Sequence, residues 1–225
     1  MSISVLDTPL PTLWLVRHGE STWNTAGLVQ GHNDEAELTE RGLRQAAEAA
    51  AQFGYRPVRA IYASDLRRAR QTAAAFAVVL GLPVYADARV RERSLGVLEG
   101  SAHKTVGPLA TGLADGRVID PDVRPPAGES VRELYQRAAA FCDDLAAGLR
   151  DGSGTLPGLA GGATDSAGPA STSGDVLVIA HGGTVRVLDA YASGVTVDQM
   201  TWRPVANATI VRIPEFGTLS QGGNR

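Results

Sequence analysis

Short apolar runs recur along the chain and alternate with longer stretches in which apolar residues follow helical spacing. The short runs predict strands at residues 12–17, 58–63, 84–86, 175–180 and 208–213. Helices are expected from Thr39 to Phe53, over 65–80 and from 130 to about 149. Because strands alternate with helices, the pattern predicts an α/β fold, a three-layer sandwich whose mostly parallel central sheet has helices on both faces.

Polar residues mark where each expected helix begins. Thr39 precedes the first helix, Ser64 and Asp65 precede the second, and Ser130 precedes the third. Side-chain oxygens of these residue types cap a helix by accepting a hydrogen bond from its first turn. The second helix should end at Gly81, a residue type that commonly follows the last helical turn.

The region 149–174 differs in composition from the rest of the chain. It is rich in Gly, Ser, Ala and Pro and cannot bury enough apolar surface to order itself, which predicts a flexible surface insertion. The chain after it is too short to form a second domain, because it holds about one strand, one helix and one more strand. We therefore expect a single domain over residues 1–225, with a polar tail at 214–225.

The charge balance and the single cysteine narrow the classes of partner. A net charge of −3 gives no basic field that would favour nucleic acid or an anionic membrane. Cys142 cannot form an intrachain disulfide, which favours a reducing compartment. The N-terminus lacks the features of a signal peptide, and no apolar run reaches the ~20 residues of a membrane span, so a cytoplasmic location is expected. The sequence leaves the oligomeric state open, with a homodimer as one option.

Two His-Gly pairs carry the candidate chemistry. His18 follows the first predicted strand and His181 follows the strand at 175–180. Ligands of such sheets bind at the carboxyl ends of the strands, so both histidines can reach one crevice, together with Arg17 and with Arg68 from the helix after the second strand. Two guanidinium forks and two imidazoles suit a phosphate dianion. Neighbouring cations should also keep His18 neutral and nucleophilic.

Several sequence runs, taken in chain order, resemble the histidine phosphatase superfamily, also called phosphoglycerate-mutase-like. The runs are LVRHGESTWN, GLVQG, LTERG, SDLRRARQTA, RERSLGVLEG, GES and VIAHGGTVR. They span residues 12–213 apart from the insertion. The resemblance implies a phosphoglycerate-mutase-like fold and a histidine acid-type phosphatase, a phosphoric monoester hydrolase, with similarity to the broad-specificity and α-ribazole-phosphate phosphatase branches.

The resemblance also implies roles for individual residues. The histidine of RHG, His18, takes up the phosphoryl group, and Glu92 is the general acid that protonates the leaving oxygen. The phosphate-binding positions of the family fall on Arg17, Asn24, Arg68 and His181, with His181 counted among the catalytic residues as well. Neither a metal nor a cofactor is expected, and the partner is a small phosphorylated substrate.

The sequence leaves several alternatives. A phosphoglycerate mutase-type phosphoryl transferase would use the same residues, but the segment 101–127 is short compared with that of such mutases. A non-catalytic phospho-metabolite-binding protein is a second rival. Glu99 competes with Glu92 for the role of general acid. A second anionic group of the substrate could meet His103, Lys104, Arg117 and Arg124. His32, Asp34 and Glu35, taken with His103, lack the spacing of a known metal-ligand set, so we expect them to be loop residues at the rim of the pocket.

Overall fold

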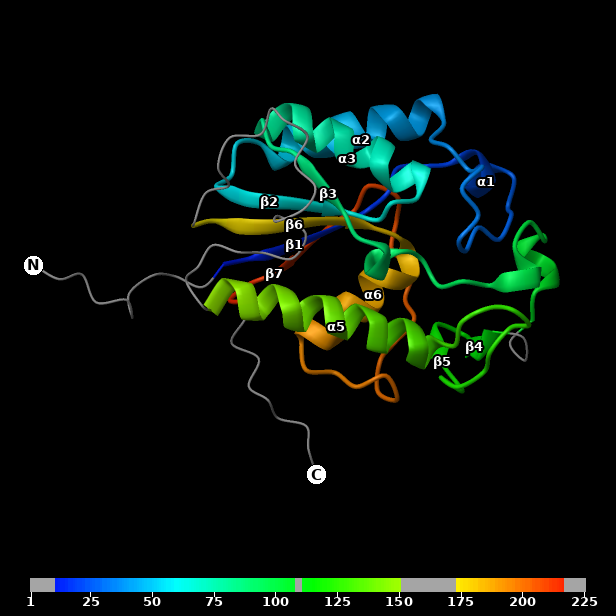
Figure 1. Ribbon diagram of the computed structural model, residues 1–225. Coiled ribbons are helices and arrows are strands. Elements are labelled where there is room, and N and C mark those ends of the chain that lie inside the picture. Colours follow the sequence, from blue (N-terminus) through cyan, green and yellow to red (C-terminus); the bar gives the residue numbers. More distant parts are fainter. Residues whose placement is uncertain (1–10, 108–110, 151–172, 217–225) are drawn as a thin grey trace, which may run out of the picture.

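The computed structural model describes residues 11–107, 111–150 and 173–216. Its main sheet has five strands in the order β3-β2-β6-β1-β7 (Figure 1). The strands are β1 (Leu13–Arg17), β2 (Val58–Ala63), β3 (Val84–Ala86), β6 (Asp175–Ala180) and β7 (Ile210–Ile213). The first four are parallel, and β7 pairs antiparallel with β1 at one edge. All the predicted strands are present, with starts displaced by at most two residues.

Two helices cover each face of this sheet. Helices α2 (Glu40–Phe53) and α3 (Arg67–Leu80) lie on one face, and α5 (Val131–Arg150) and α6 (Gly182–Ala192) lie on the other (Figure 1). Alternate side chains of a strand point to opposite faces, so β6 supplies Leu177 to the core under α2 and α3 and Val178 to the core under α5 and α6. The predicted three-layer α/β architecture is confirmed.

The polar caps predicted for the first and third helices are confirmed. The Thr39 hydroxyl accepts a hydrogen bond from the Gly42 amide at 3.0 Å at the start of α2. Ser130 and Glu133 form a reciprocal pair at the start of α5, in which the Ser130 hydroxyl accepts from the Glu133 amide and a Glu133 carboxylate oxygen accepts from the Ser130 amide.

The cap predicted for the second helix is wrong. Helix α3 begins at Arg67 after Leu66, whose side chain makes no capping hydrogen bond. The Asp65 carboxylate is instead paired with the Arg91 guanidinium, with 2.6 Å between Oδ1 and Nε. A forked guanidinium binds a carboxylate more strongly than backbone amides do, so the ion pair takes the side chain that the sequence pattern assigned to the cap. The predicted end at Gly81, in the left-handed conformation with φ 65°, is confirmed.

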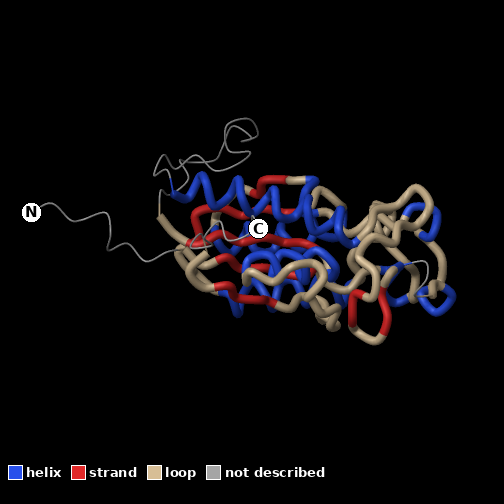
Figure 2. The backbone as a smooth tube through the Cα atoms, turned by 90° about the horizontal axis from the view of Figure 1, so that it is seen from below, coloured by secondary structure: helices blue, strands red, loops and turns tan. Residues whose placement is uncertain are grey.

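Several short elements were absent from the sequence prediction. They are α1 (Thr22–Thr25), the hairpin of β4 (Leu113–Ala114) and β5 (Arg117–Val118), and 3-10 turns at 88–90, 96–98 and 103–105. Apart from the turn at 88–90, they lie beyond the carboxyl ends of the parallel strands, where Figure 2 shows loops and the hairpin gathered at one end of the molecule. This end carries the candidate site.

Two predicted boundaries shift. Helix α5 continues through Arg150, so residues 149 and 150 do not belong to an insertion, while 151–172 lie outside the described residues. The predicted tail starts too early, because Phe216 is buried and its amide donates to the Pro11 carbonyl at 2.8 Å. Residues 217–225 lie outside the described part. No described helix is long and apolar enough to cross a membrane. The single-domain organisation stays a prediction.

Candidate active site

The two His-Gly pairs meet at one edge of the sheet because their strands are neighbours. Strands β1 and β6 pair in parallel, with Arg17 opposite Ala180. His18 and His181 follow those two positions, and their ring centroids lie 5.2 Å apart. His181 is also the residue that precedes helix α6. The sequence prediction that the two histidines share one site is therefore consistent with this geometry.

His18 is held in a defined tautomer. The residue is buried, and its Nδ1 lies 2.7 Å from the Gly19 carbonyl oxygen. A carbonyl can only accept, so Nδ1 carries the hydrogen and Nε2 keeps its lone pair. Burial lowers the pKa of His18 well below its ordinary value, and the positive charges of Arg68 and Arg17 lower it further. The imidazole is consequently neutral at pH 7.

Arg68 approaches the histidines from the first turn of α3. Its side chain is fully buried, and its two terminal nitrogens donate to the Asn33 carbonyl at 2.9 Å and to the Gly31 carbonyl at 2.8 Å. Burial lowers the pKa of Arg68 to about 10, so the guanidinium still carries its charge at pH 7. Its Nε has no hydrogen-bond partner among the described residues.

Further polar atoms near His18 are also buried without partners in the described part of the chain. These are the donor Nε of Arg17 and the two ring nitrogens of His181, one of which carries the hydrogen in the neutral ring. Arg17 is oriented by one bond from its guanidinium to the Val205 carbonyl. Buried polar groups are normally hydrogen-bonded, so this group of unpaired donors from three residues indicates a place where an anionic ligand supplies the acceptors.

A cavity of about 410 Å³ opens beside these donors. Five of the residues that the sequence analysis assigned to the site line it: Arg17, His18, Asn24, Arg68 and Glu92. His181 is fully buried next to His18 and is not among the lining residues, so its contact with phosphate stays a prediction. Apolar side chains line other parts of the wall: Val29, Leu95, Val106, Leu113 and Trp202.

Asn24 is oriented by its neighbours. The side-chain oxygen of Asn24 accepts hydrogen bonds from the Ser21 amide at 3.0 Å and from Nδ2 of Asn207 at 3.2 Å. Since the oxygen is occupied, the NH2 group is the part of this amide that remains to donate to an anion in the cavity.

Glu92 is the acidic residue among the described residues that line the cavity. Its Oε2 accepts from the Gly183 amide at 2.9 Å, at the start of α6, and its Oε1 accepts from the Arg93 amide at 2.9 Å. A Cβ at position 183 would lie 2.2 Å from Oε1, so only glycine lets α6 approach this carboxylate. The carboxyl group is thereby fixed on the wall of the cavity.

Glu99, the competitor for the acid role, has a different environment. Its Oε1 accepts from the backbone amides of His32 and Leu95, each at 2.9 Å, and the residue does not line the cavity. Glu99 therefore connects the loop at His32 with the backbone at Leu95.

No metal site is found at the described loop residues either. The ring of His32 contacts the Glu92 carbonyl oxygen at 2.8 Å. The described residues contain no group of three or more side chains able to hold a metal ion.

Of the four residues that the sequence analysis offered for a second anionic group, one lines this cavity. His103 lines the cavity, whereas Lys104, Arg117 and Arg124 do not. Arg124 is instead paired with Glu133, with 3.0 Å between the charged atoms.

Sequence reasoning missed Arg186, which lines the cavity from α6 and lies over the Trp202 ring at 5.0 Å. The signal was present, because Arg186 stands four residues after Gly182 in one helix, and residues at that spacing share a face.

Known proteins resemble this chain over most of its length. The profile of the histidine phosphatase superfamily (branch 1) matches residues 13–156. A probable phosphoglycerate mutase GpmB of Klebsiella pneumoniae is 40% identical over 145 residues, which are 61% of this chain and 66% of that relative. A GpmB of Yersinia pestis is 39% identical over 58% of this chain and 61% of its own length. The chain thus matches less than two thirds of the length of these relatives.

Solved structures match a larger share of this chain than these relatives do. A mycobacterial glucosyl-3-phosphoglycerate phosphatase in complex with VO3 superposes with a TM-score of 0.71 at 30% identity, covering 90% of both chains. The protein TTHB049 of Thermus thermophilus gives a TM-score of 0.59 at 27% identity, covering 89% of this chain and 91% of that one. The sheet order, the paired RHG and HGG strand ends and the matching profile together show that this chain belongs to the histidine phosphatase superfamily, with the phosphoglycerate-mutase-like fold that its motifs imply.

Proposed function

We propose that this protein is a metal-independent phosphomonoesterase that acts on a small phosphorylated metabolite through a phosphohistidine on His18. The observation that carries the proposal is the state of His18. It is neutral, its Nδ1 is engaged by the Gly19 carbonyl, and its Nε2 is left for attack beside unpaired donors of Arg17 and Arg68. This arrangement supplies a nucleophile and a dianion site at the same place.

The first step transfers the phosphoryl group to His18. Nε2 attacks phosphorus, the P–N bond forms, and the P–O bond to the leaving group breaks. The proton of the Glu92 carboxyl group moves to the leaving oxygen, so the alcohol departs neutral. Arg17 and Arg68 offset the charge that the phosphoryl oxygens carry in a loose transition state. The Asn24 amide and His181 would donate to the same oxygens.

The second step returns the enzyme to its starting state. A water molecule gives a proton to the Glu92 carboxylate and attacks phosphorus. The P–N bond breaks, inorganic phosphate forms, and His18 is again neutral. Glu92 thus acts as acid in the first half and as base in the second.

The names of similar proteins support this proposal at two levels. The structural neighbours that match nine tenths of this chain include a glucosyl-3-phosphoglycerate phosphatase. The probable phosphoglycerate mutases match a shorter part of the chain. Both reactions would begin with transfer to His18, and they differ in whether water or a second hydroxyl group takes the phosphoryl group away.

Phosphate release from a panel of sugar phosphates, phosphoglycerates and phosphorylated cofactor precursors tests the proposal. We expect release that persists in EDTA and falls to below about one thousandth in His18→Ala. An acid-labile phosphoenzyme should form with the native protein and be absent from His18→Ala. Isomerisation of 3-phosphoglycerate without release would establish the mutase instead, and binding without turnover would establish a phospho-metabolite-binding protein.

A further inference from the structure

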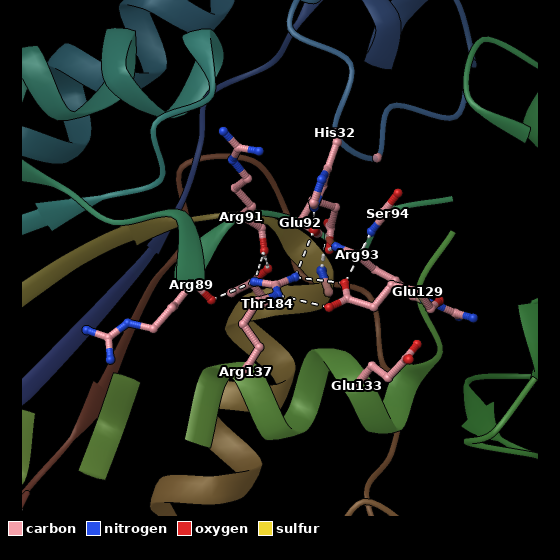
Figure 3. A network of polar contacts seen from close by, with 12 residues as sticks. His32, Arg89, Arg91, Glu92, Arg93, Ser94, Glu129, Glu133, Arg137 and Thr184 are labelled. Carbon is pink, nitrogen blue, oxygen red and sulfur yellow. Dashed lines mark hydrogen bonds and ion pairs between the residues drawn. The ribbon is translucent and has the colours of Figure 1, made fainter. Parts of the chain in front are cut away.

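A cluster of polar contacts surrounds the backbone that carries Glu92 (Figure 3). At its centre is Arg137, which reaches from α5 to residues 89–94, named here the Glu92 segment. The guanidinium donates to the carbonyl oxygens of Arg89 at 2.6 Å, Arg91 at 3.0 Å and Glu92 at 3.1 Å. Its other two bonds go to the carboxylate of Glu129, at 2.9 and 2.8 Å. An arginine has five N–H donors, so every donor of Arg137 is used.

Glu129 extends the same contacts to the other end of the Glu92 segment. Its amide donates to the Ser94 carbonyl at 2.9 Å, and its Oε2 accepts from the Ser94 amide at 3.3 Å. The Arg137–Glu129 pair is mostly buried, with side-chain exposures of 20% and 15%. The pair therefore holds the segment both before and after Glu92.

Two further side chains hold the segment from other elements. The hydroxyl of Thr184, in the first turn of α6, donates to the Arg91 carbonyl at 2.7 Å. The His32 ring contacts the Glu92 carbonyl oxygen at 2.8 Å from the loop that also supplies acceptors to Arg68. The main chain at Glu92 is thus fixed by contacts from α5, α6 and the loop at 31–33 together.

We infer that Arg137 is a positioning residue that fixes the carboxyl group of Glu92 against the start of α6 for proton transfer to the leaving oxygen. Arg137 does not line the cavity, so it acts on the reaction through Glu92 and not through the substrate. This inference rests on the proposed function, since it requires Glu92 to be the general acid.

The expected size of the effect follows from the contacts that are lost. Without the guanidinium, three carbonyl oxygens of the Glu92 segment and the Glu129 carboxylate lose donors, and the segment is held less tightly, by the remaining contacts of Thr184, His32 and Glu129. A displacement of about 1 Å at a reacting group can cost about a hundredfold in rate. The loss should fall on the step that needs the proton. An ester with a poor leaving group depends on that step, whereas p-nitrophenyl phosphate depends on it little.

The test compares kcat for an alkyl phosphate with kcat for p-nitrophenyl phosphate in Arg137→Met, which keeps an unbranched apolar stem and removes the donors. We expect the alkyl rate to fall about 10- to 100-fold more than the p-nitrophenyl rate. In a Glu92→Gln background, Arg137→Met should leave the ratio of the two rates unchanged, because no proton remains to be positioned. In Arg137→Lys, the ratio of the alkyl rate to the p-nitrophenyl rate should lie between that of Arg137→Met and that of the native enzyme.

Arg132→Met is the matched control. Arg132 lies on the same helix and is paired with Asp122 and Asp198, at 2.7 and 2.9 Å, without contact to the Glu92 segment. In Arg132→Met, the ratio of the alkyl rate to the p-nitrophenyl rate should equal that of the native enzyme. Thr184→Val is the substitute if Arg137→Met does not fold. It removes one donor to the Glu92 segment and should lower the ratio of the alkyl rate to the p-nitrophenyl rate, by a smaller factor than Arg137→Met.

Three outcomes are distinguishable. A selective loss with alkyl phosphate in Arg137→Met supports the positioning role. Equal losses with both substrates, or no loss, overturn it if Glu92→Gln is itself selective. An unselective Glu92→Gln would instead remove the acid role from the proposed function, and the positioning role would fail with it.

Discussion

At the scale of single residues, His18 and Glu92 are held in complementary ways. The backbone fixes which nitrogen of His18 carries the hydrogen, through the Gly19 carbonyl at 2.7 Å. Backbone amides of Arg93 and Gly183 fix where the Glu92 carboxyl group points. In both residues, the atoms that would react are placed by main-chain groups of neighbouring segments, which have less freedom than side chains do.

The first prediction at this scale concerns the proton on Glu92. Glu92→Gln keeps the size of the side chain and removes its acid function. We expect kcat to fall about 100- to 10,000-fold with an alkyl phosphate and about tenfold or less with p-nitrophenyl phosphate, whose leaving group needs little protonation. Steady-state assays with both substrates check this expectation. The acid role would be excluded by equal losses with the two esters.

The second prediction concerns the stability of the protein at low pH. Burial, and after it the charge of Arg68, lower the pKa values of His18 and His181 well below their ordinary value of 6.5. Below pH 6.5 the unfolded chain takes up protons at these histidines that the folded chain does not, so the free energy of unfolding should decrease as the pH falls. The decrease is up to about 1.4 kcal/mol per pH unit for each histidine.

Urea unfolding at pH 8.0, 6.5 and 5.5 measures this dependence. The free energy of unfolding should decrease by less than about 1 kcal/mol between pH 8.0 and 6.5 and more steeply from pH 6.5 to 5.5. His181→Gln removes one of the two titrating groups and should reduce the slope below pH 6.5. Identical slopes in the native protein and this variant would contradict the assignment.

At the scale of elements, caps and turns position the helices that carry the site. Helix α2 begins at Glu40 because Thr39 takes an extended conformation and its hydroxyl accepts from the Gly42 amide. That hydroxyl also donates to Oε1 of Glu20 at 2.9 Å, which connects the start of α2 to the loop after His18. A cap residue in this protein therefore contacts both a helix and the loop that follows His18.

The prediction at this scale is a loss of stability in Thr39→Ala. Removing the cap should lower the free energy of unfolding by about 1 kcal/mol. Thr39→Ser retains the hydroxyl group and should stay within about 0.5 kcal/mol of the native protein. Denaturant unfolding of the three proteins under one set of conditions measures the difference. A serine variant as unstable as the alanine variant would show that the methyl group, and not the cap, matters.

At the scale of the whole molecule, the sheet separates two hydrophobic cores. Phe76 of α3 is fully buried in the core on one face, and Phe141 of α5 is fully buried in the core on the other. Each strand of the centre contributes side chains to both, so neither face can unpack without disturbing the sheet. We expect the two cores to unfold in one cooperative transition, as the single-domain prediction requires.

Phe76→Leu and Phe141→Leu test this expectation. Each substitution should lower the free energy of unfolding by about 1–2 kcal/mol, and the double variant should show the sum within about 0.5 kcal/mol, because the two side chains share no contact across the sheet. Near-ultraviolet and far-ultraviolet circular dichroism should report the same midpoint in each variant. Separate midpoints would show that the two faces belong to different cooperative units.

The sequence by itself determined the strands, the main helices and the central polar residues of the cavity wall, Arg17, His18, Asn24, Arg68 and Glu92. Local signals suffice for these features: buried strands such as β2 and β6 are continuous apolar runs, and the RHG and HGG runs stand at strand ends. The alternation of strands and helices predicts a mostly parallel sheet whose strands carry ligands at their carboxyl ends, which is why His18 and His181 were expected at one crevice. That β1 and β6 are direct neighbours was decided by the sheet order.

Only the tertiary structure decided how each polar side chain is used. Asp65 is a residue type that caps helices and stands where a cap was predicted, but its carboxylate forms an ion pair with Arg91. Glu99 could serve as a general acid by its residue type, but its carboxylate accepts hydrogen bonds from backbone amides. Arg137 looks like any charged residue of an exposed helix face, yet all its donors bind the Glu92 segment and its partner Glu129. The physical reason is that a charged side chain is satisfied by whichever partners folding brings within about 3 Å, and such partners lie far away in the sequence.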